Sequence, residues 1–154
     1  MSLRNNSGFT VIELVTVIAL LGILAGIAIV SMGNPWGFHS LAEAEALKAN
    51  LRFTQSKAMS DLPGNLWSLN ISSANYTIQR NGGAPNPVVN LPGSNSGTYT
   101  LPSGVSITAG TGLVRFNFRG QPIDTLGSPL VAPLTITVYG APSITVTQET
   151  GFIP

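Results

Sequence analysis

The feature that most constrains this 154-residue chain is an apolar segment near its start. Between residues 14 and 42 no side chain is Asp, Glu, Lys or Arg, and the strongly apolar part covers about residues 9–32. As a helix, that part would be about 35 Å long, enough to cross a hydrocarbon core of about 30 Å. The segment is apolar on all sides, so we expect it to lie in lipid and not against one face of a protein core.

One acidic residue, Glu13, stands near the start of this segment. An ionised carboxylate in hydrocarbon costs about 2.5–3.5 kcal/mol, so a plain membrane anchor would not carry one. A secretory signal peptide would use Arg4 as its charged region and be cut near residues 28–33. An uncleaved signal anchor would leave the segment in place. Under both interpretations Glu13 has no purpose.

A third interpretation places the cut before the apolar segment. Cleavage between Gly8 and Phe9 would create a new amino terminus on Phe9, with Glu13 as residue five of the mature chain. The amine and the carboxylate would then be about one helical turn apart. They could pair within one chain or between neighbouring chains, and pairing makes a buried charge tolerable.

These residues resemble the class III prepilin signal, which type IV pilins share with the pseudopilins of type II secretion. The resemblance covers about residues 3–30, with a glycine before the cut, an aromatic residue after it, and an acid four positions beyond that. It implies that the prepilin peptidase, a membrane aspartyl peptidase, cuts after Gly8 and methylates the amine of Phe9. It also implies that Glu13 is an assembly contact, which meets the terminal amine of a neighbouring subunit in a filament.

The apolar helix is expected to end or kink at residues 33–37, where Pro35 lies between two glycines. Trp36 and Phe38 would then either anchor the chain at the membrane–water interface or pack against the globular body. Ser40 and Glu43 have the spacing of a capping box, which predicts that a second helix begins there.

Residues 44–59 have strong helical propensity. Apolar side chains at three- and four-residue spacing predict a stripe that lies against a sheet: Leu41, Ala44, Leu47, Leu51 and Ala58. Glu45 and Lys48 should pair on the outer side. Residues 61–64 contain Pro and Gly and should end the helix.

Short alternating segments follow and predict antiparallel strands at 66–71, 75–80, 97–101, 105–108, 113–118, 134–139 and 143–147. The last two should form a hairpin. Val114, Phe116 and Phe118 should share one face of their strand, and residues 84–96 should form a long surface loop. The predicted fold is α+β and pilin-like: a long N-terminal apolar helix, kinked near 33–37, followed by an antiparallel sheet or sandwich body.

This layout predicts four parts. They are a leader peptide (1–8), a transmembrane and filament-core helix (9–32), a linker with an amphipathic helix (33–62), and a periplasmic β domain (63–154).

The carboxy-terminal body also resembles the GspH/FimT branch of the family. The resemblance rests on the turn at residues 116–122 and on the Thr150–Gly151 pair, each beside terminal strands. It implies a minor subunit that acts near filament tips or in initiation. Some members bind DNA through basic residues near the carboxy terminus, but here no Lys or Arg follows Arg119, so nucleic acid is disfavoured. Arg115 and Arg119 could form a small basic patch, although a strand-face charge and a turn residue are the simpler interpretation.

The residue inventory argues against catalysis. The chain has no cysteine and a single histidine, His39, which excludes disulfides, thiol chemistry and multi-histidine metal sites. No catalytic triad or phosphate loop is present, and Asp61, Asp124 and Glu149 are too scattered to suggest a calcium loop. We therefore expect neither an enzyme nor a cofactor.

The expected function is a minor pilin or pseudopilin subunit of a type IV pilus or type II secretion filament. The chain would be held in the bacterial inner membrane by one helix, with its carboxy-terminal domain in the periplasm, before it joins the filament. Its partners would be the prepilin peptidase, other pilin or pseudopilin subunits, the inner-membrane assembly platform and membrane lipid. Two alternatives stay open: a tip-located module that binds DNA, a surface or secretion cargo, and an anchored β domain that does not polymerise.

Overall fold

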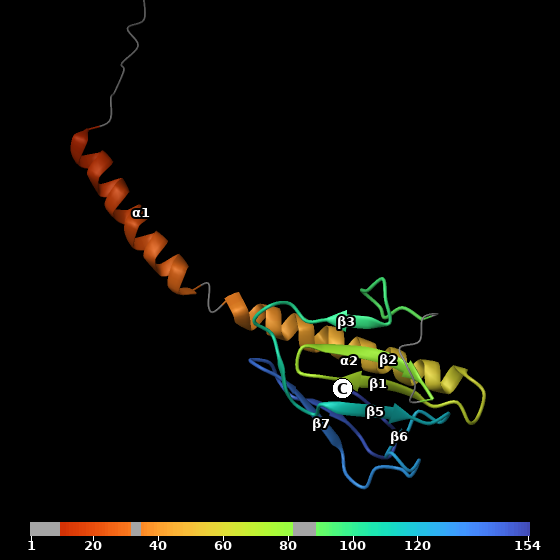
Figure 1. The fold of residues 1–154 in the computed structure, drawn as a ribbon. Helices are drawn as coiled ribbons and strands as arrows, with labels where there is room; N and C mark the ends of the chain where they lie inside the picture. The colour runs from red at the N-terminus through yellow and green to blue at the C-terminus, as the bar shows by residue number, and fades with distance from the viewer. Residues whose placement is uncertain (1–9, 32–34, 82–88) are drawn as a thin grey trace, which may run out of the picture. The chain divides into compact units, whose positions relative to one another are not determined.

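The computed structural model describes residues 10–31, 35–81 and 89–154, without the side chains of residues 29–31 and 35–37 (Figure 1). The chain divides into two compact units, Met1–Pro35 and Trp36–Pro154. The first unit holds helix α1 (Val11–Ser31), and the second holds nearly all of helix α2 (Pro35–Ser60) and the strands. An apolar helix followed by an antiparallel sheet body is the α+β arrangement predicted from the sequence.

Helix α1 forms because residues 11–31 are an unbroken run dominated by Val, Ile, Leu and Ala. Its large hydrophobic side chains are between 47% and 80% exposed. None of these side chains is therefore buried in the described structure.

Helix α2 begins earlier than the sequence pattern predicted. It starts at Pro35, and proline is favoured at the first helical position because its missing N–H would have no partner there. The predicted capping box at Ser40 is therefore wrong, because Ser40 lies inside the helix and is buried. Glu43 does not cap the helix either: its Oε1 accepts a hydrogen bond from the Tyr99 hydroxyl at 3.1 Å.

The predicted apolar stripe of α2 faces the core. Four of its five members are buried, namely Ala44, Leu47, Leu51 and Ala58, whereas Leu41 is 44% exposed and was wrongly included. Lys48 Nζ lies 2.8 Å from Glu45 Oε1, which confirms the predicted ion pair. The helix ends at Ser60, as the residues that follow it predicted.

The body contains two antiparallel sheets in its described residues. The larger one has the strand order β3 (Thr98–Thr100), β2 (Asn75–Arg80), β1 (Trp67–Ile71), β5 (Gly112–Phe116) and β6 (Pro122–Ile123). The smaller one has the order β4 (Ile107–Ala109), β7 (Leu134–Val138) and β8 (Ile144–Val146). One hydrophobic core joins α2 to strands of both sheets, and β7 and β8 form the predicted hairpin.

Most predicted strands are confirmed with small changes at their ends, and two differences have clear causes. Strand β5 ends at Phe116, so Phe118 is not on its buried face but lies in a turn with 45% of its side chain exposed. Asn117 starts that turn, because its Oδ1 accepts hydrogen bonds from the backbone N–H groups of Arg119 and Gln121. Strand β6 was not predicted, since two residues show no periodicity.

The predicted surface loop at 84–96 is described only from residue 89 onward. In that part Leu91 is buried and joins the core, so the segment is not wholly a surface loop.

The carboxy-terminal tail is tied to α2 through backbone carbonyls. Gln55 Nε2 donates to the carbonyl oxygens of Gly120 (2.8 Å), Gly151 (3.1 Å) and Thr150 (3.2 Å). Arg52 donates from Nη2 and Nε to the Ile153 carbonyl, at 2.8 Å and 3.2 Å. The amide of Gln55 and the guanidinium of Arg52 therefore hold the carboxy-terminal tail against α2.

Gly151 has no room for a side chain. Its φ is +67°, and a Cβ there would overlap the Gly120 carbonyl oxygen and approach Gln55 Nε2 to 2.6 Å. Gly127 has a similar φ of +87°, but a Cβ there would meet nothing within 4 Å. A substitution at Gly127 therefore adds only backbone strain, whereas the same substitution at Gly151 adds both backbone strain and steric overlap.

We expect Gly151→Ala to lower the free energy of unfolding of the body by about 3 kcal/mol or more, because strain and overlap add. Gly127→Ala, the matched control, should cost about 1–2 kcal/mol, the price of a left-handed residue with a side chain. Denaturant unfolding of the full chain in detergent, followed by circular dichroism, measures both. Equal losses for the two variants would contradict the packing described here.

Asp61 directly follows the last residue of α2 and binds side chains of β1 and β2. Its carboxylate accepts hydrogen bonds from Trp67 Nε1 (2.8 Å), the Leu62 backbone N–H (2.8 Å) and Asn65 Nδ2 (3.1 Å), and it pairs with Arg80. The Trp67 hydrogen bond, followed by that from Leu62, lowers the pKa of Asp61 from 3.8 to about 2. Because the folded-state pKa is depressed, this carboxylate stabilises the fold above the unfolded-state pKa and loses that effect as the pH falls.

Asp61→Asn should therefore lower the melting temperature at neutral pH, and the gap to wild type should close as the pH falls from about 4 to about 2. Glu45→Gln serves as the control, since it removes an exposed ion pair that contributes little. Thermal unfolding at several pH values measures the gap. A gap that stays constant down to pH 2 would contradict the assigned network.

Candidate functional site

The first turn of α1 is organised by Thr10. The backbone N–H of Glu13 donates to the Thr10 carbonyl (3.1 Å) and to Thr10 Oγ1 (3.3 Å), and the Leu14 N–H donates to the same carbonyl (3.2 Å). This is the Thr-x-x-Glu spacing of a capping box, with Thr10 as the N-cap. The carboxylate of Glu13 stands in the first turn of α1, where the helix dipole favours negative charge.

Of the three residues expected to form the processing and assembly site, the structure describes Glu13. Gly8 and Phe9 lie outside the described residues, so the cleavage position stays a prediction. The neighbours of Glu13 in the helix, Ile12 and Leu14, are 69% and 59% exposed. Glu13 is thus flanked along the chain by exposed apolar residues, and an ionised carboxylate buried among such residues needs a charged partner.

The rest of α1 has the properties of a membrane-spanning helix by length and composition. The window Val11–Ala28 has a mean hydropathy of 2.6 and no part of it is buried. Gly22 and Gly26 are four residues apart on the same face, and a Cβ on either would meet nothing within 4 Å. This Gly-x-x-x-Gly spacing, which lets two membrane helices approach closely, was readable from the sequence but was not part of the predicted site.

A polar cluster lies where α2 crosses the large sheet. The rings of Tyr76 and Tyr99 stack with their centres 5.2 Å apart, Asn50 Nδ2 donates to the Tyr76 hydroxyl (2.9 Å), and Tyr99 donates to Glu43. Burial raises the pKa of Tyr76, and burial together with the Glu43 hydrogen bond raises the pKa of Tyr99. Both phenols stay protonated at neutral pH, so the cluster fastens α2 to the sheet.

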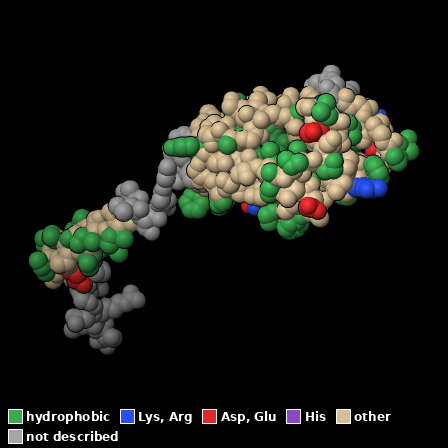
Figure 2. All heavy atoms as spheres, turned by 90° about the horizontal axis from the view of Figure 1, so that it is seen from below, with side chains coloured by type: hydrophobic (Ala, Val, Ile, Leu, Met, Phe, Trp, Pro, Cys, Tyr) green, Lys and Arg blue, Asp and Glu red, His purple; other side chains and the backbone are tan. Residues whose placement is uncertain are grey.

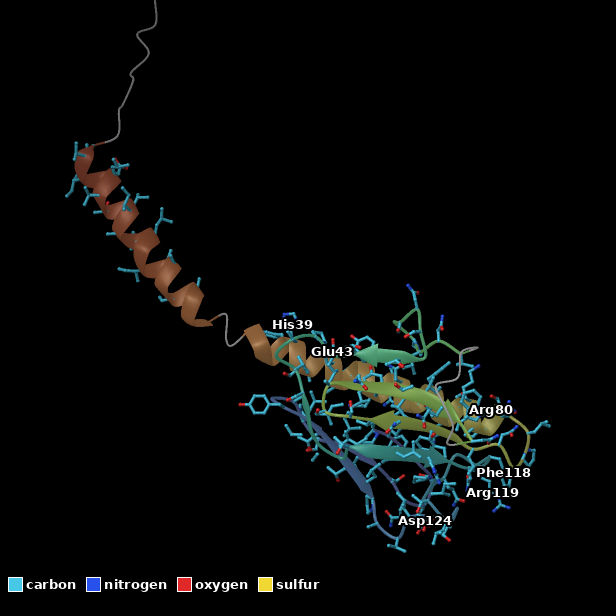
Figure 3. All side chains as sticks on the ribbon, viewed as in Figure 1. His39, Glu43, Arg80, Phe118, Arg119 and Asp124 are labelled. Carbon is cyan, nitrogen blue, oxygen red and sulfur yellow. The ribbon has the colours of Figure 1, made fainter. Side chains whose placement is uncertain are left out.

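The two arginines considered as a basic patch each have a local partner. Arg115 Nη1 donates to the Thr125 carbonyl at 3.0 Å, and the Arg119 guanidinium lies 5.2 Å from the centre of the Phe118 ring. Figure 3 shows Arg119 beside Phe118, with Arg80 at the same end of the body. Their positions, on a strand and in a turn, are those expected of structural residues.

The scattered acids also have roles within the fold. Asp124 Oδ1 accepts hydrogen bonds from the backbone N–H groups of Leu126 and Ser128, both at 2.8 Å, and so closes its own loop. Asp61 is engaged by Trp67 and Arg80. Within the described part of the chain, no three His, Cys, Asp or Glu side chains gather in a group that could hold a metal ion.

In a comparison with protein families, residues 3–29 match the prokaryotic N-terminal methylation motif. The match begins before the predicted cleavage position and covers nearly all of α1. Searches of curated proteins and of solved structures gave no match.

Proposed function

We propose that this chain is the precursor of a pilin-like subunit. It is cut after Gly8 by a prepilin peptidase, methylated on Phe9, held in the bacterial inner membrane by α1, and then assembled with other pilin or pseudopilin subunits. The observation that carries the proposal is the coincidence of the methylation motif with α1. Motif, exposed apolar helix and capped first-turn acid occupy one continuous segment.

Glu13 acts in assembly. When α1 packs among other helices, the carboxylate is enclosed by apolar side chains with no water to solvate it. The methylated amine on Phe9 of a neighbouring subunit supplies the compensating charge. Thr10 supports this role, because it fixes the backbone of Glu13 through the cap and so limits where the carboxylate can reach.

Packing of α1 against other helices uses its small residues. Gly22 and Gly26 leave two neighbouring positions on one face of the helix without a side chain, which allows a neighbouring backbone to approach there. The larger apolar residues around them supply the contact area. The filament core is thus a bundle of α1 helices, and the body faces outward.

The body belongs to a non-catalytic minor subunit of the GspH/FimT kind. The two stretches that carry this resemblance, the turn ending in Gly120-Gln121-Pro122 and the Thr150–Gly151 pair, meet at Gln55. Gln121 Nε2 also donates to the Glu149 carbonyl at 2.9 Å. The turn, the Thr150–Gly151 pair and Gln55 thus form one connected set of hydrogen bonds. A type IV pilus and a type II secretion filament would both use such a subunit.

Processing is tested by Gly8→Leu. A branched side chain in a tight peptidase subsite should abolish cleavage, so the precursor keeps its eight-residue leader when expressed with a prepilin peptidase. Ser7→Ala is the control and should be cleaved as wild type is. Gel mobility of the pulse-labelled chain measures the outcome, and normal cleavage of the Gly8→Leu variant would count against the proposal.

Assembly is tested at Glu13. Glu13→Leu should be processed normally but enter filaments at least about tenfold less well, since breaking one buried ion pair costs about 3–5 kcal/mol. Glu45→Leu, which removes an acid on the exposed side of α2, should assemble normally. Immunoblots of sheared filaments against membrane fractions measure incorporation, and equal incorporation of Glu13→Leu and wild type would refute the assigned role.

A further inference from the structure

One end of the body is formed by the start of α2 and three chain turns, which we call the helix-start cap (residues 38–42, 72–74, 102–106 and 139–143). Hydrogen bonds hold the turns together: Ile107 N–H to the Ser73 carbonyl (2.9 Å), Leu101 N–H to Ala74 (2.9 Å), and Tyr139 N–H to Ser106 (2.8 Å). The hairpin turn also touches the helix, because a Cβ on Gly140 would lie 3.4 Å from Ser40 Oγ.

The helix-start cap carries no Asp, Glu, Lys or Arg in any of its four segments. It consists mainly of Ser, Ala, Gly and Pro, and its exposed large hydrophobic residues are Phe38 (71% exposed), Tyr139 (68%) and Leu41 (44%); His39 is also exposed. Arg80, Phe118 and Arg119 lie at the other end of the body, away from His39 at the start of α2 (Figure 3). In the space-filling view the most prominent Lys or Arg side chain lies far from the end where α2 starts, and a smaller blue patch lies nearer to that end beside an acidic side chain (Figure 2).

Exposed aromatic rings in an uncharged surface suit the headgroup level of a membrane. Tyrosine, which has an apolar ring and a polar tip, is enriched there, and small hydroxyl-bearing residues tolerate partial dehydration better than charged ones. The covalent chain also keeps the cap near any membrane that holds α1. Phe38 follows Ser31, the last residue of α1, by seven positions, which is at most about 25 Å of extended chain.

We propose that the helix-start cap rests on the bilayer that holds α1, with Phe38 and Tyr139 inserted at the boundary between headgroups and acyl chains. The inference rests on the proposed function for the placement of α1 in a membrane. Because the cap has no charged side chain, the contact uses apolar insertion and does not need anionic lipid. Phe38 is too exposed to pack against the body, which favours the interfacial alternative for this residue, whereas the side chain of Trp36 lies outside the described part of the chain.

The absence of cysteine makes a direct test available, since one introduced cysteine carries one probe. The full chain is reconstituted in phosphatidylcholine vesicles with a fluorophore on Ser103→Cys, in the cap, or on Ser60→Cys, at the last residue of α2. Both serines are exposed, and Ser60 lies about 30 Å along the helix from Ser40. Lipids that carry a nitroxide on the headgroup should quench the probe at residue 103 severalfold more than the probe at residue 60.

Paired variants identify the side chains responsible. In the Ser103→Cys background, Phe38→Ser with Tyr139→Ser should remove the excess quenching, whereas Leu126→Ser with Val131→Ser should leave it unchanged. The control pair is at least as exposed, 89% and 98%, but lies in the loop after β6. Circular dichroism confirms that both variants fold.

Equal quenching at residues 103 and 60 would overturn the inference, and so would quenching that requires phosphatidylglycerol. Quenching that rises with protein density would also overturn it, because it would indicate contact between copies of the chain. Excess quenching with no cleavage after Gly8 would uphold the cap while refuting the prepilin function. Cleavage without excess quenching would do the reverse. A chain that fails to float with the vesicles would refute both.

Discussion

The constraint on which this molecule depends is the covering of α1. Its exposed Val, Ile and Leu side chains each contribute about 1.5–3 kcal/mol when removed from water, so a few of them outweigh the cost of one carboxylate among them. Glu13 therefore does not prevent α1 from entering a membrane or a helix bundle. Under the proposed function, Glu13 instead favours those positions of the helix that bring a cation beside its carboxylate, because only they offset the cost of burying it. In this account the buried apolar area provides most of the free energy of assembly, and Glu13 determines the position of one helix along its neighbour.

The body solves a different problem with few charges and no disulfide. Its apolar core joins one helix to two small sheets. Polar side-chain contacts add to this core: Gln55 and Arg52 bind the tail, Asp61 binds Trp67 and Arg80, and the stacked tyrosines bind side chains of α2. Gln55 and Arg52 donate to backbone carbonyls, whereas the contacts of Asp61 with Trp67 and Arg80 and those of the tyrosines join side chains to one another. The four segments of the helix-start cap carry no Asp, Glu, Lys or Arg, whereas α2 carries charged side chains from Glu43 onward.

Local patterns in the sequence predicted the parts of this fold that depend on periodicity. The spacing of Leu47 and Leu51 predicted the buried face of α2, and the alternation around Val114 predicted β5. The patterns failed where two local signals compete. The Ser/Thr-x-x-Glu pattern occurs twice, and it was assigned at Ser40, which lies within the helix begun by Pro35, and overlooked at Thr10, where it does cap a helix.

Contacts between residues far apart in sequence could not be predicted from such patterns. Gln55 meets Gly151 across 96 positions, and nothing local to either residue indicates the other. The same holds for the helix-start cap, which four separate segments build together. For the candidate site, the sequence predicted the position of Glu13, and the spacing of Thr10 and Glu13 also indicates the cap that the structure shows.

The central claim is that the chain matures by cleavage before α1, and the mass of the mature amino terminus tests it most directly. The full chain would be expressed with and without a prepilin peptidase, and its N-terminal peptide analysed by mass spectrometry. We predict a peptidase-dependent product that begins at Phe9 and carries one methyl group on its amine. A product that still begins at Met1 in the presence of the peptidase, or one cut beyond Ala28, would contradict the account.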